Sequence, residues 1–74
     1  MEETQIRKKI IGNRLRNLRQ GRSLSYVSHD LGIGVSTLCM YERGLRTPSD
    51  DTKIKIAEYY GTTVHDIFFK KETD

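Results

Sequence analysis

The chain has no tryptophan, one proline and one cysteine among its 74 residues. The lone thiol, Cys39, permits neither an internal disulfide nor a zinc site built on cysteines. No apolar run approaches the roughly 20 residues that a membrane-spanning helix needs. The start, Met1-Glu2-Glu3, is acidic and leads into no apolar segment, so the sequence predicts neither a secretory signal nor a transit peptide. We therefore expect one small cytoplasmic domain without a membrane segment, stabilised by packing alone or by a partner chain.

Positive charge is unevenly distributed along the sequence. The formal net charge is +3, but residues 1–22 hold seven Lys or Arg against two Glu, while residues 23–74 hold six against eight acids. A basic segment of this kind indicates a polyanionic partner, nucleic acid first and an anionic membrane surface second. A solvated helix face is the alternative interpretation.

The spacing of the apolar residues and the positions of the glycines predict five helices and no strand. Apolar residues recur at helical intervals between glycines, and Ser23, Ser49 and Thr63 each stand where a helix N-cap is expected. The expected helices cover residues 6–20, 24–31, 35–43, 50–60 and 64–68. The organisation that follows is a basic extension at 1–10 continuous with the first helix, a domain at 11–69 and a tail at 70–74.

Residues 24–44 form the most informative part of the sequence. A short helix, a glycine-centred turn and a second short helix at this spacing predict a helix-turn-helix. We expect Ser28 to be small because the helices nearly touch there, Gly32 to adopt positive φ, and Ile33 to plug the turn. A similar corner occurs in helical bundles of other kinds, so this span alone leaves that alternative open.

With its flanks, the sequence resembles the Cro/C1-type (XRE-like) helix-turn-helix family of bacterial and phage regulators over residues 11–69. The residues that carry the resemblance are Ile11-Gly12, Leu15 through Arg19, Val27-Ser28, Leu31-Gly32-Ile33, Leu38, Tyr41 through Gly44, Arg46 through Ser49, Ile56-Ala57, Tyr60-Gly61 and Val64 through Phe68. The resemblance implies an all-α, compact five-helix, lambda-repressor-like domain. It also implies a protein that is dimeric on its operator, with the second helix of the motif in the major groove.

The resemblance further implies which residues contact DNA. The candidates for base contact are Val35, Ser36, Thr37, Cys39 and Met40, and those for backbone contact are Leu24, Ser25, Arg43 and Arg46. The predicted recognition helix lacks Arg, Asn and Gln at its front, the side chains best suited to bidentate base readout. Apolar contact with thymine methyl groups by Val35, Thr37 and Met40 is therefore the expected mode.

Other chemistry finds little support in the residues. His29 and His65 lie far apart without ligand-like neighbours, so no metal is predicted. Asp50 and Asp51 are explained by the dipole at a helix start rather than as an acid/base pair. Cys39 is expected to be a plain small residue rather than a redox thiol, because no basic neighbour or resolving cysteine is evident. No catalytic constellation and no cofactor site is predicted, so we expect no enzyme.

Aromatic residues near the end of the chain suggest a dimer interface. Phe68 and Phe69 are consecutive, so about 100° of helix separates them and one should be exposed. Together with Tyr59 they are the dimer-interface candidates, and poor burial in a mobile tail is the alternative interpretation. The sequence thus predicts a sequence-specific, double-stranded DNA-binding transcriptional regulator, a repressor of phage or mobile-element type acting as a homodimer. The alternative is an antitoxin-like or antirepressor-like protein-interaction module with the same fold.

Overall fold

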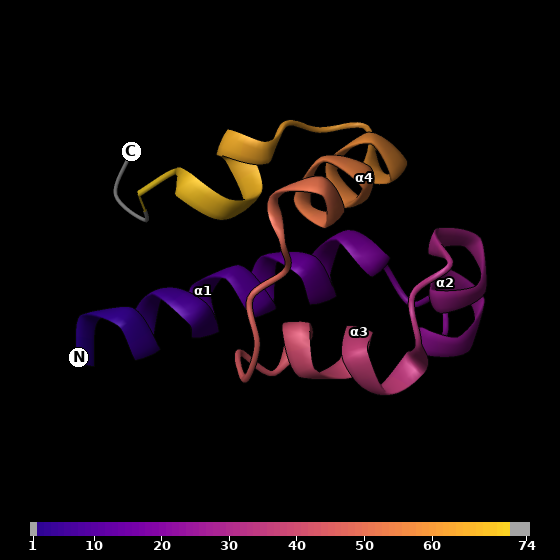
Figure 1. The fold of residues 1–74 in the computed structure, drawn as a ribbon, viewed down its shortest axis with the longest axis horizontal. Coiled ribbons are helices and arrows are strands. Elements are labelled where there is room, and N and C mark those ends of the chain that lie inside the picture. The colour runs from indigo at the N-terminus through magenta and orange to yellow at the C-terminus, as the bar shows by residue number, and fades with distance from the viewer. Residues whose placement is uncertain (1, 72–74) are drawn as a thin grey trace.

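A computed structural model describes residues 2–71 of the chain (Figure 1). It contains α1 (Glu2–Arg19), α2 (Leu24–Leu31), α3 (Val35–Glu42), α4 (Asp50–Tyr60) and a π-helical turn, η1 (His65–Phe69). No strand occurs among the described residues, so the predicted all-α fold is confirmed. Met1 of the predicted extension and residues 72–74 of the predicted tail lie outside the described residues.

Helix α1 runs through the middle of the fold and the other elements surround it. Figure 1 shows α3 on one side of α1, α4 and η1 on the other, and α2 beyond the end of α1. Every element contributes side chains to one core. Its buried apolar members are Leu15, Val27, Leu31, Leu38, Tyr41, Ile56, Ala57, Ile67 and Phe68.

Helix boundaries follow the predicted caps closely. Ser23 accepts a hydrogen bond from the Tyr26 backbone N–H at 3.0 Å, and Ser49 accepts one from the Thr52 N–H at 3.4 Å. Gly32 has φ +68°, as predicted for the turn of the motif. These local interactions end and start helices where the sequence indicated, because each depends only on residues within one turn.

The first and the last helix differ most from the predictions. Helix α1 begins at Glu2, four residues earlier than the apolar periodicity indicated. The last helix is a π-turn from His65 to Phe69 rather than an α-helical turn from residue 64. Thr63 still caps it, since its hydroxyl accepts a hydrogen bond from the Asp66 N–H at 3.0 Å.

Helices α1 and α3 nearly touch at Gly12. A Cβ atom on Gly12 would lie 2.3 Å from the carbonyl oxygen of Glu42, closer than real Cβ atoms approach a backbone atom. Glycine is therefore required here for packing and not for backbone conformation. This close approach holds the last turn of α3 against the middle of α1.

The three dimer-interface candidates differ in exposure and in position. Phe68 is 2% exposed and belongs to the core, whereas Phe69 is 47% exposed. Tyr59 is half-buried, and its hydroxyl donates a hydrogen bond to Asp30 at 2.8 Å, away from Phe69. The three aromatics therefore form no common exposed patch, because adjacent residues of η1 point in different directions and Tyr59 is held against α2.

Candidate nucleic-acid interface

Helices α2 and α3 are joined by a tight turn at residues 32–34. The Ile33 N–H donates to the carbonyl oxygen of Ser28 at 3.1 Å, and the Ser28 hydroxyl donates back to the carbonyl oxygen of Ile33. Ser28 is buried, and it closes the turn by a hydrogen bond that the sequence did not indicate. Ile33 is half-buried against the core. The turn fixes α3 relative to α2.

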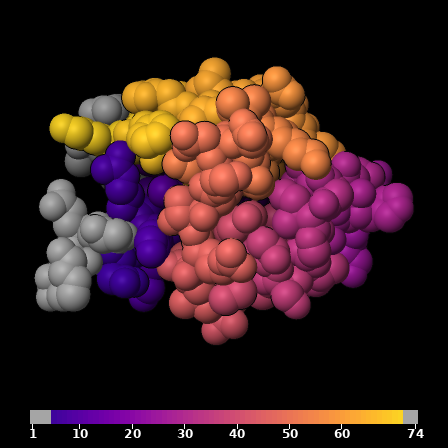
Figure 2. Space-filling model, viewed as in Figure 1, coloured from indigo at the N-terminus to yellow at the C-terminus, as the bar shows by residue number. Residues whose placement is uncertain are grey.

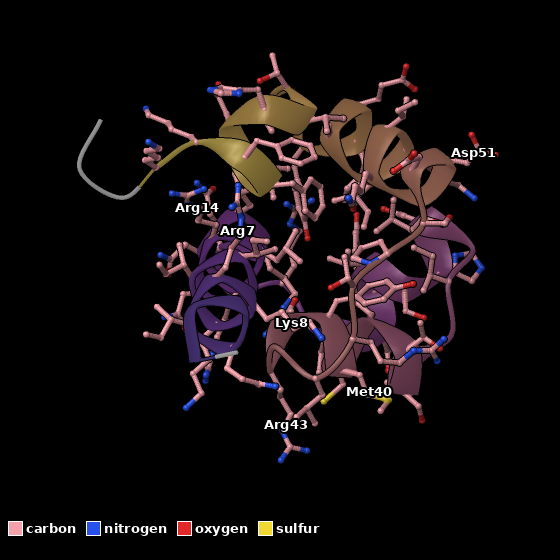
Figure 3. The ribbon with its side chains drawn as sticks, turned by 60° about the vertical axis from the view of Figure 1, so that its left-hand side comes forward. Arg7, Lys8, Arg14, Met40, Arg43 and Asp51 are labelled. Atoms are coloured by element: carbon pink, nitrogen blue, oxygen red, sulfur yellow. The ribbon has the colours of Figure 1, made fainter. Side chains whose placement is uncertain are left out.

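Helix α3 has an inner and an outer face. Leu38, Tyr41 and Glu42 are buried and point inward. The outer face carries Ser36, Cys39, Met40 and Arg43, which recur at helical spacing, and Val35 at its front is 44% exposed. In Figure 3, Met40 and Arg43 project from the same side of α3, away from the body of the protein.

The remaining predicted contact residues differ in their exposure. Ser25 and Arg46 are exposed, whereas Thr37 is half-buried. Leu24, at the start of α2, is also half-buried and packs against the core. Of the predicted backbone contacts, Leu24 thus has a structural role of its own, since its side chain contributes to packing.

The first half of α1 lies beside the C-terminal end of α3. A Cβ atom on Gly44 would lie 3.1 Å from the backbone of Lys8 and Lys9, so the two segments are in contact. Figure 2 shows the start of α1, in indigo, next to the α3–α4 connection on the surface. Lys8 and Lys9 therefore stand near Arg43 and Arg46, which are far from them in sequence.

Comparisons with known proteins agree with this geometry. A family model described as helix-turn-helix matches residues 14–67. The chain belongs to this helix-turn-helix family. It is also 30% identical over 67 residues to the cryptic phage CTXphi transcriptional repressor RstR of Vibrio cholerae, a match that covers 88% of this chain and 60% of the relative. The chain thus spans about three fifths of the length of that curated relative. No solved structure matches the chain.

An ion pair between α1 and the inward face of α3 supports the helix-turn-helix. The sequence did not indicate this ion pair. The Arg19 guanidinium donates from Nε to Glu42 Oε2 at 2.8 Å and from Nη2 to Oε1 at 2.9 Å. The Glu42 side chain is 6% exposed and that of Arg19 is 17% exposed. Hydrogen bonding to Glu42 raises the pKa of Arg19 above its ordinary value. The available signal was an acid on the inward face of α3, where it needs a cationic partner.

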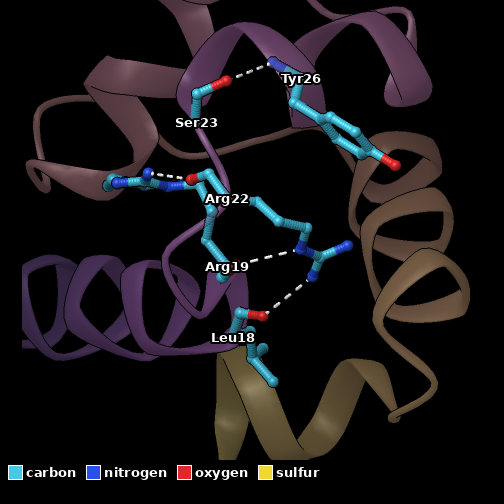
Figure 4. A network of polar contacts seen from close by, with 6 residues as sticks. Leu18, Arg19, Arg22, Ser23 and Tyr26 are labelled. Carbon is cyan, nitrogen blue, oxygen red and sulfur yellow. Dashed lines mark hydrogen bonds and ion pairs between the residues drawn. The ribbon is translucent and has the colours of Figure 1, made fainter.

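Two other arginines near the motif are also held by the protein itself. Arg22 donates to the carbonyl oxygens of Arg19 and Leu18 at 3.0 and 3.2 Å (Figure 4), and to the Tyr59 hydroxyl at 3.1 Å. Arg14 donates to three carbonyl oxygens around η1, those of Asp66, Ile67 and Lys70, at 3.3, 3.0 and 2.8 Å. Much of the charge in residues 1–22 is therefore structural rather than available to a polyanion.

Two tyrosine rings, those of Tyr59 and Tyr60, pack against the Arg22 guanidinium. Arg22 lies over the rings of Tyr59 and Tyr60, 5.4 and 5.6 Å from their centroids. Burial raises the pKa of Tyr60, and the nearby negative charge of Glu42 adds to the shift. The Tyr60 hydroxyl is buried and has no hydrogen-bond partner among the described residues.

The described residues contain neither a candidate metal site nor a candidate membrane span. No group of three His, Cys, Asp or Glu residues within the described part of the chain is arranged to hold a metal ion. Over the same residues, none of the helices combines the length and apolarity that crossing a bilayer takes.

Proposed function

We propose that the protein is a sequence-specific, double-stranded DNA-binding transcriptional regulator, a non-enzymatic repressor of phage type. The observation that carries this proposal is the outer face of α3, which projects from a helix-turn-helix and carries exposed Arg43, with exposed Arg46 in the connection that follows. The similarity to a phage transcriptional repressor supports repression rather than activation. Residues 11–69 are the proposed DNA-binding domain, and the cytoplasm is its proposed location.

Base recognition by this face is proposed to be mostly apolar. Val35 stands at the front of α3 and can offer only a methyl contact, for which the thymine methyl group is the counterpart in the major groove. Ser36 can exchange hydrogen bonds with a base edge or a phosphate. Thr37, Cys39 and Met40 complete the proposed set of base contacts, while Ser25, Leu24, Arg43 and Arg46 form the proposed backbone set.

A homodimer on a two-fold operator is part of the proposal. Phe69 and Ile6 are 47% and 57% exposed, and with Ile10 they line a groove of about 170 Å³ between α1 and η1. This groove lies at one end of the longest dimension of the Cα trace, which is 31 Å. Two copies meeting there would have centres a little over 31 Å apart. That distance suits half-sites about 34–36 Å apart along DNA.

The proposed base recognition can be tested by a double-mutant cycle. In it, the thymine methyl group and the Val35 side chain are removed separately and together. The probe is the DNA that flanks the protein's own coding region, narrowed to its bound site, with each thymine replaced in turn by uracil. Removing the contacted methyl should weaken wild-type binding, whereas Val35→Ala should be nearly indifferent because it has already lost the contact. We expect a coupling of about 1 kcal/mol at one thymine.

A scrambled duplex at the same salt concentration is the control, since nonspecific binding gives no such coupling. If no fragment binds better than the scramble, the proposal of a sequence-specific regulator is wrong. If, in addition, Val35→Asp disrupts a protein complex of this chain, the protein-interaction module becomes the better reading of the α3 face.

A further inference from the structure

Charged side chains are segregated between the elements of the fold. Acids with described side chains lie on α2, α4 and η1, and the only other one is Glu42, which Arg19 neutralises. Residues 5–19, the part of α1 whose side chains the structure describes, and the α3–α4 connection carry cations and no acid. Their exposed or half-buried cations on the α3 side of the molecule are Lys8, Lys9, Arg16, Arg43 and Arg46.

These five cations make no ion pair or hydrogen bond with any residue whose side chain the structure describes. This distinguishes them from Arg14, Arg19 and Arg22, whose guanidinium groups are held by carbonyl oxygens and by Glu42.

Gly12 determines where two of these cations stand. Lys9 precedes Gly12 by three residues and Arg16 follows it by four, so all three lie on one face of α1. That face touches α3, because the Cβ position of Gly12 is 2.3 Å from the Glu42 carbonyl oxygen. Lys9 and Arg16 therefore flank the last turn of α3 on either side of the contact.

Arg7 lies on the opposite side of the same helix. It lines the groove between α1 and η1, together with Ile6 and Phe69. Figure 3 shows Arg7 and Arg14 on the η1 side of α1, while Lys8 faces the end of α3 near Arg43. Two basic residues only two positions apart, Arg7 and Lys9, are thus directed to different surfaces.

We infer that α1 supplies a second row of phosphate contacts, made by Lys9 and Arg16, alongside the recognition helix. The inference rests on the proposed DNA-binding function and extends its footprint beyond the helix-turn-helix. A helix in the major groove is bordered by the phosphates of both strands, and long cationic side chains beside it can reach them. The row carries affinity and no base information, because α1 lies beside α3 and not in the groove with it.

The salt dependence of binding tests this inference. The probe is a random duplex of about 12 base pairs, long enough for one protomer, so that neither specificity nor dimerisation enters the measurement. The plot of log affinity against log salt concentration has a negative slope. Lys9→Gln and Arg16→Gln should each lower the magnitude of this slope by about 0.9, the value for one phosphate contact. Arg7→Gln removes the same charge from the other side of α1 and should leave the slope nearly unchanged.

The outcomes separate this inference from the proposed function. If Lys9→Gln and Arg16→Gln change the slope no more than Arg7→Gln does, the phosphate row is wrong, while preference of the wild type for its operator still stands. If the wild type binds the random duplex but prefers no operator, the regulator proposal fails and the slopes still decide the phosphate row. A wild type that binds no duplex at low salt overturns both.

The comparison of slopes requires that the three variants keep the melting temperature of the wild type. A large drop in the melting temperature of Lys9→Gln or Arg16→Gln would assign that residue a structural role instead.

Discussion

Two sets of cations in the N-terminal third of the chain look alike in the sequence and differ in the structure. The inner cations, Arg14, Arg19 and Arg22, are each bound by several acceptors within the protein. The outer cations, Lys8, Lys9 and Arg16, have no such partner among the described side chains. Arg16 and Arg19 are three residues apart on one helix, yet only Arg19 reaches a carboxylate.

The difference shows that net charge overstates the charge available to a ligand. Arg19 meets Glu42 because the two helices converge at Gly12, and Arg14 meets η1 because the chain returns to α1 at its end. An arginine bound in this way has exchanged hydration for fixed hydrogen bonds and adds stability to the fold. Unlike these arginines, Lys9 and Arg16 are exposed, as phosphate binding requires.

The largest expected effect comes from separating α1 and α3. Gly12→Val should destabilise the protein by at least about 3 kcal/mol, since the new side chain overlaps the backbone of Glu42 and must push the helices apart. The Arg19–Glu42 pair would be disturbed by the same movement. Urea denaturation followed by circular dichroism measures the loss.

Gly34→Ala is the matched control for this substitution. A Cβ atom there would lie 3.8 Å from its nearest neighbour, the Thr37 hydroxyl, and the φ of Gly34 is an ordinary −59°. The expected cost is below about 1 kcal/mol. Equal stability of the two variants would mean that α1 and α3 do not meet closely at Gly12.

Removing the partner of an inner cation should have the next largest effect. Glu42→Ala leaves the Arg19 guanidinium without its carboxylate and should cost about 2 kcal/mol, at the lower end for a buried pair because Arg19 is 17% exposed. Thermal and urea denaturation both report this loss. Arg16→Ala, in the outer set, should change stability by less than about 0.5 kcal/mol. If Arg16→Ala proved as destabilising as Glu42→Ala, the division into two sets would be wrong.

Arg14 should show a smaller effect of the same kind. Arg14→Ala removes the donors to three carbonyl oxygens around η1 and should cost about 1 kcal/mol, because two of these hydrogen bonds are exposed to solvent. Hydrogen exchange should also become faster at the amides of η1. Arg7→Ala provides the control on the same side of α1, and slower or unchanged exchange in Arg14→Ala would contradict the assigned role.

The smallest expected effect concerns Tyr59, which links Arg22 to Asp30. Donation of its hydroxyl hydrogen to Asp30 raises the pKa of Tyr59 above its ordinary value. A raised pKa in the folded state stabilises the protein fully below the unfolded value of about 10, and the contribution is lost as the pH rises through the folded pKa. Ultraviolet titration of tyrosinate should therefore contain a late component from Tyr60 and another from Tyr59, the second of which Tyr59→Phe removes. Asp30→Asn should lower the pKa of the Tyr59 component, and an unaltered titration would show that Asp30 does not control it.

Local sequence determined most of the helical framework of this protein. Ser23, Ser49 and Thr63 cap helices as predicted, and Gly32 adopts positive φ in the turn. Such signals are readable because a cap or a left-handed glycine involves only atoms within a few residues of one another. The spacing of the helix-turn-helix belongs to the same class of information. The proposed DNA contacts on α3 remain predictions that the experiments above address.

Tertiary structure alone decided which cations are inner and which are outer. The sequence placed Arg16 and Arg19 on the same basic helix, but only the convergence of α1 and α3 at Gly12 brings Glu42 to Arg19, 23 residues away. The sequence predicted that one of Phe68 and Phe69 is exposed, and the packing of η1 makes Phe68 the core residue and Phe69 the exposed one. Contacts between distant segments depend on helix crossing and on backbone approach. A one-dimensional pattern does not encode these quantities, because the same spacing of apolar and charged residues is compatible with several rotations of one helix against another.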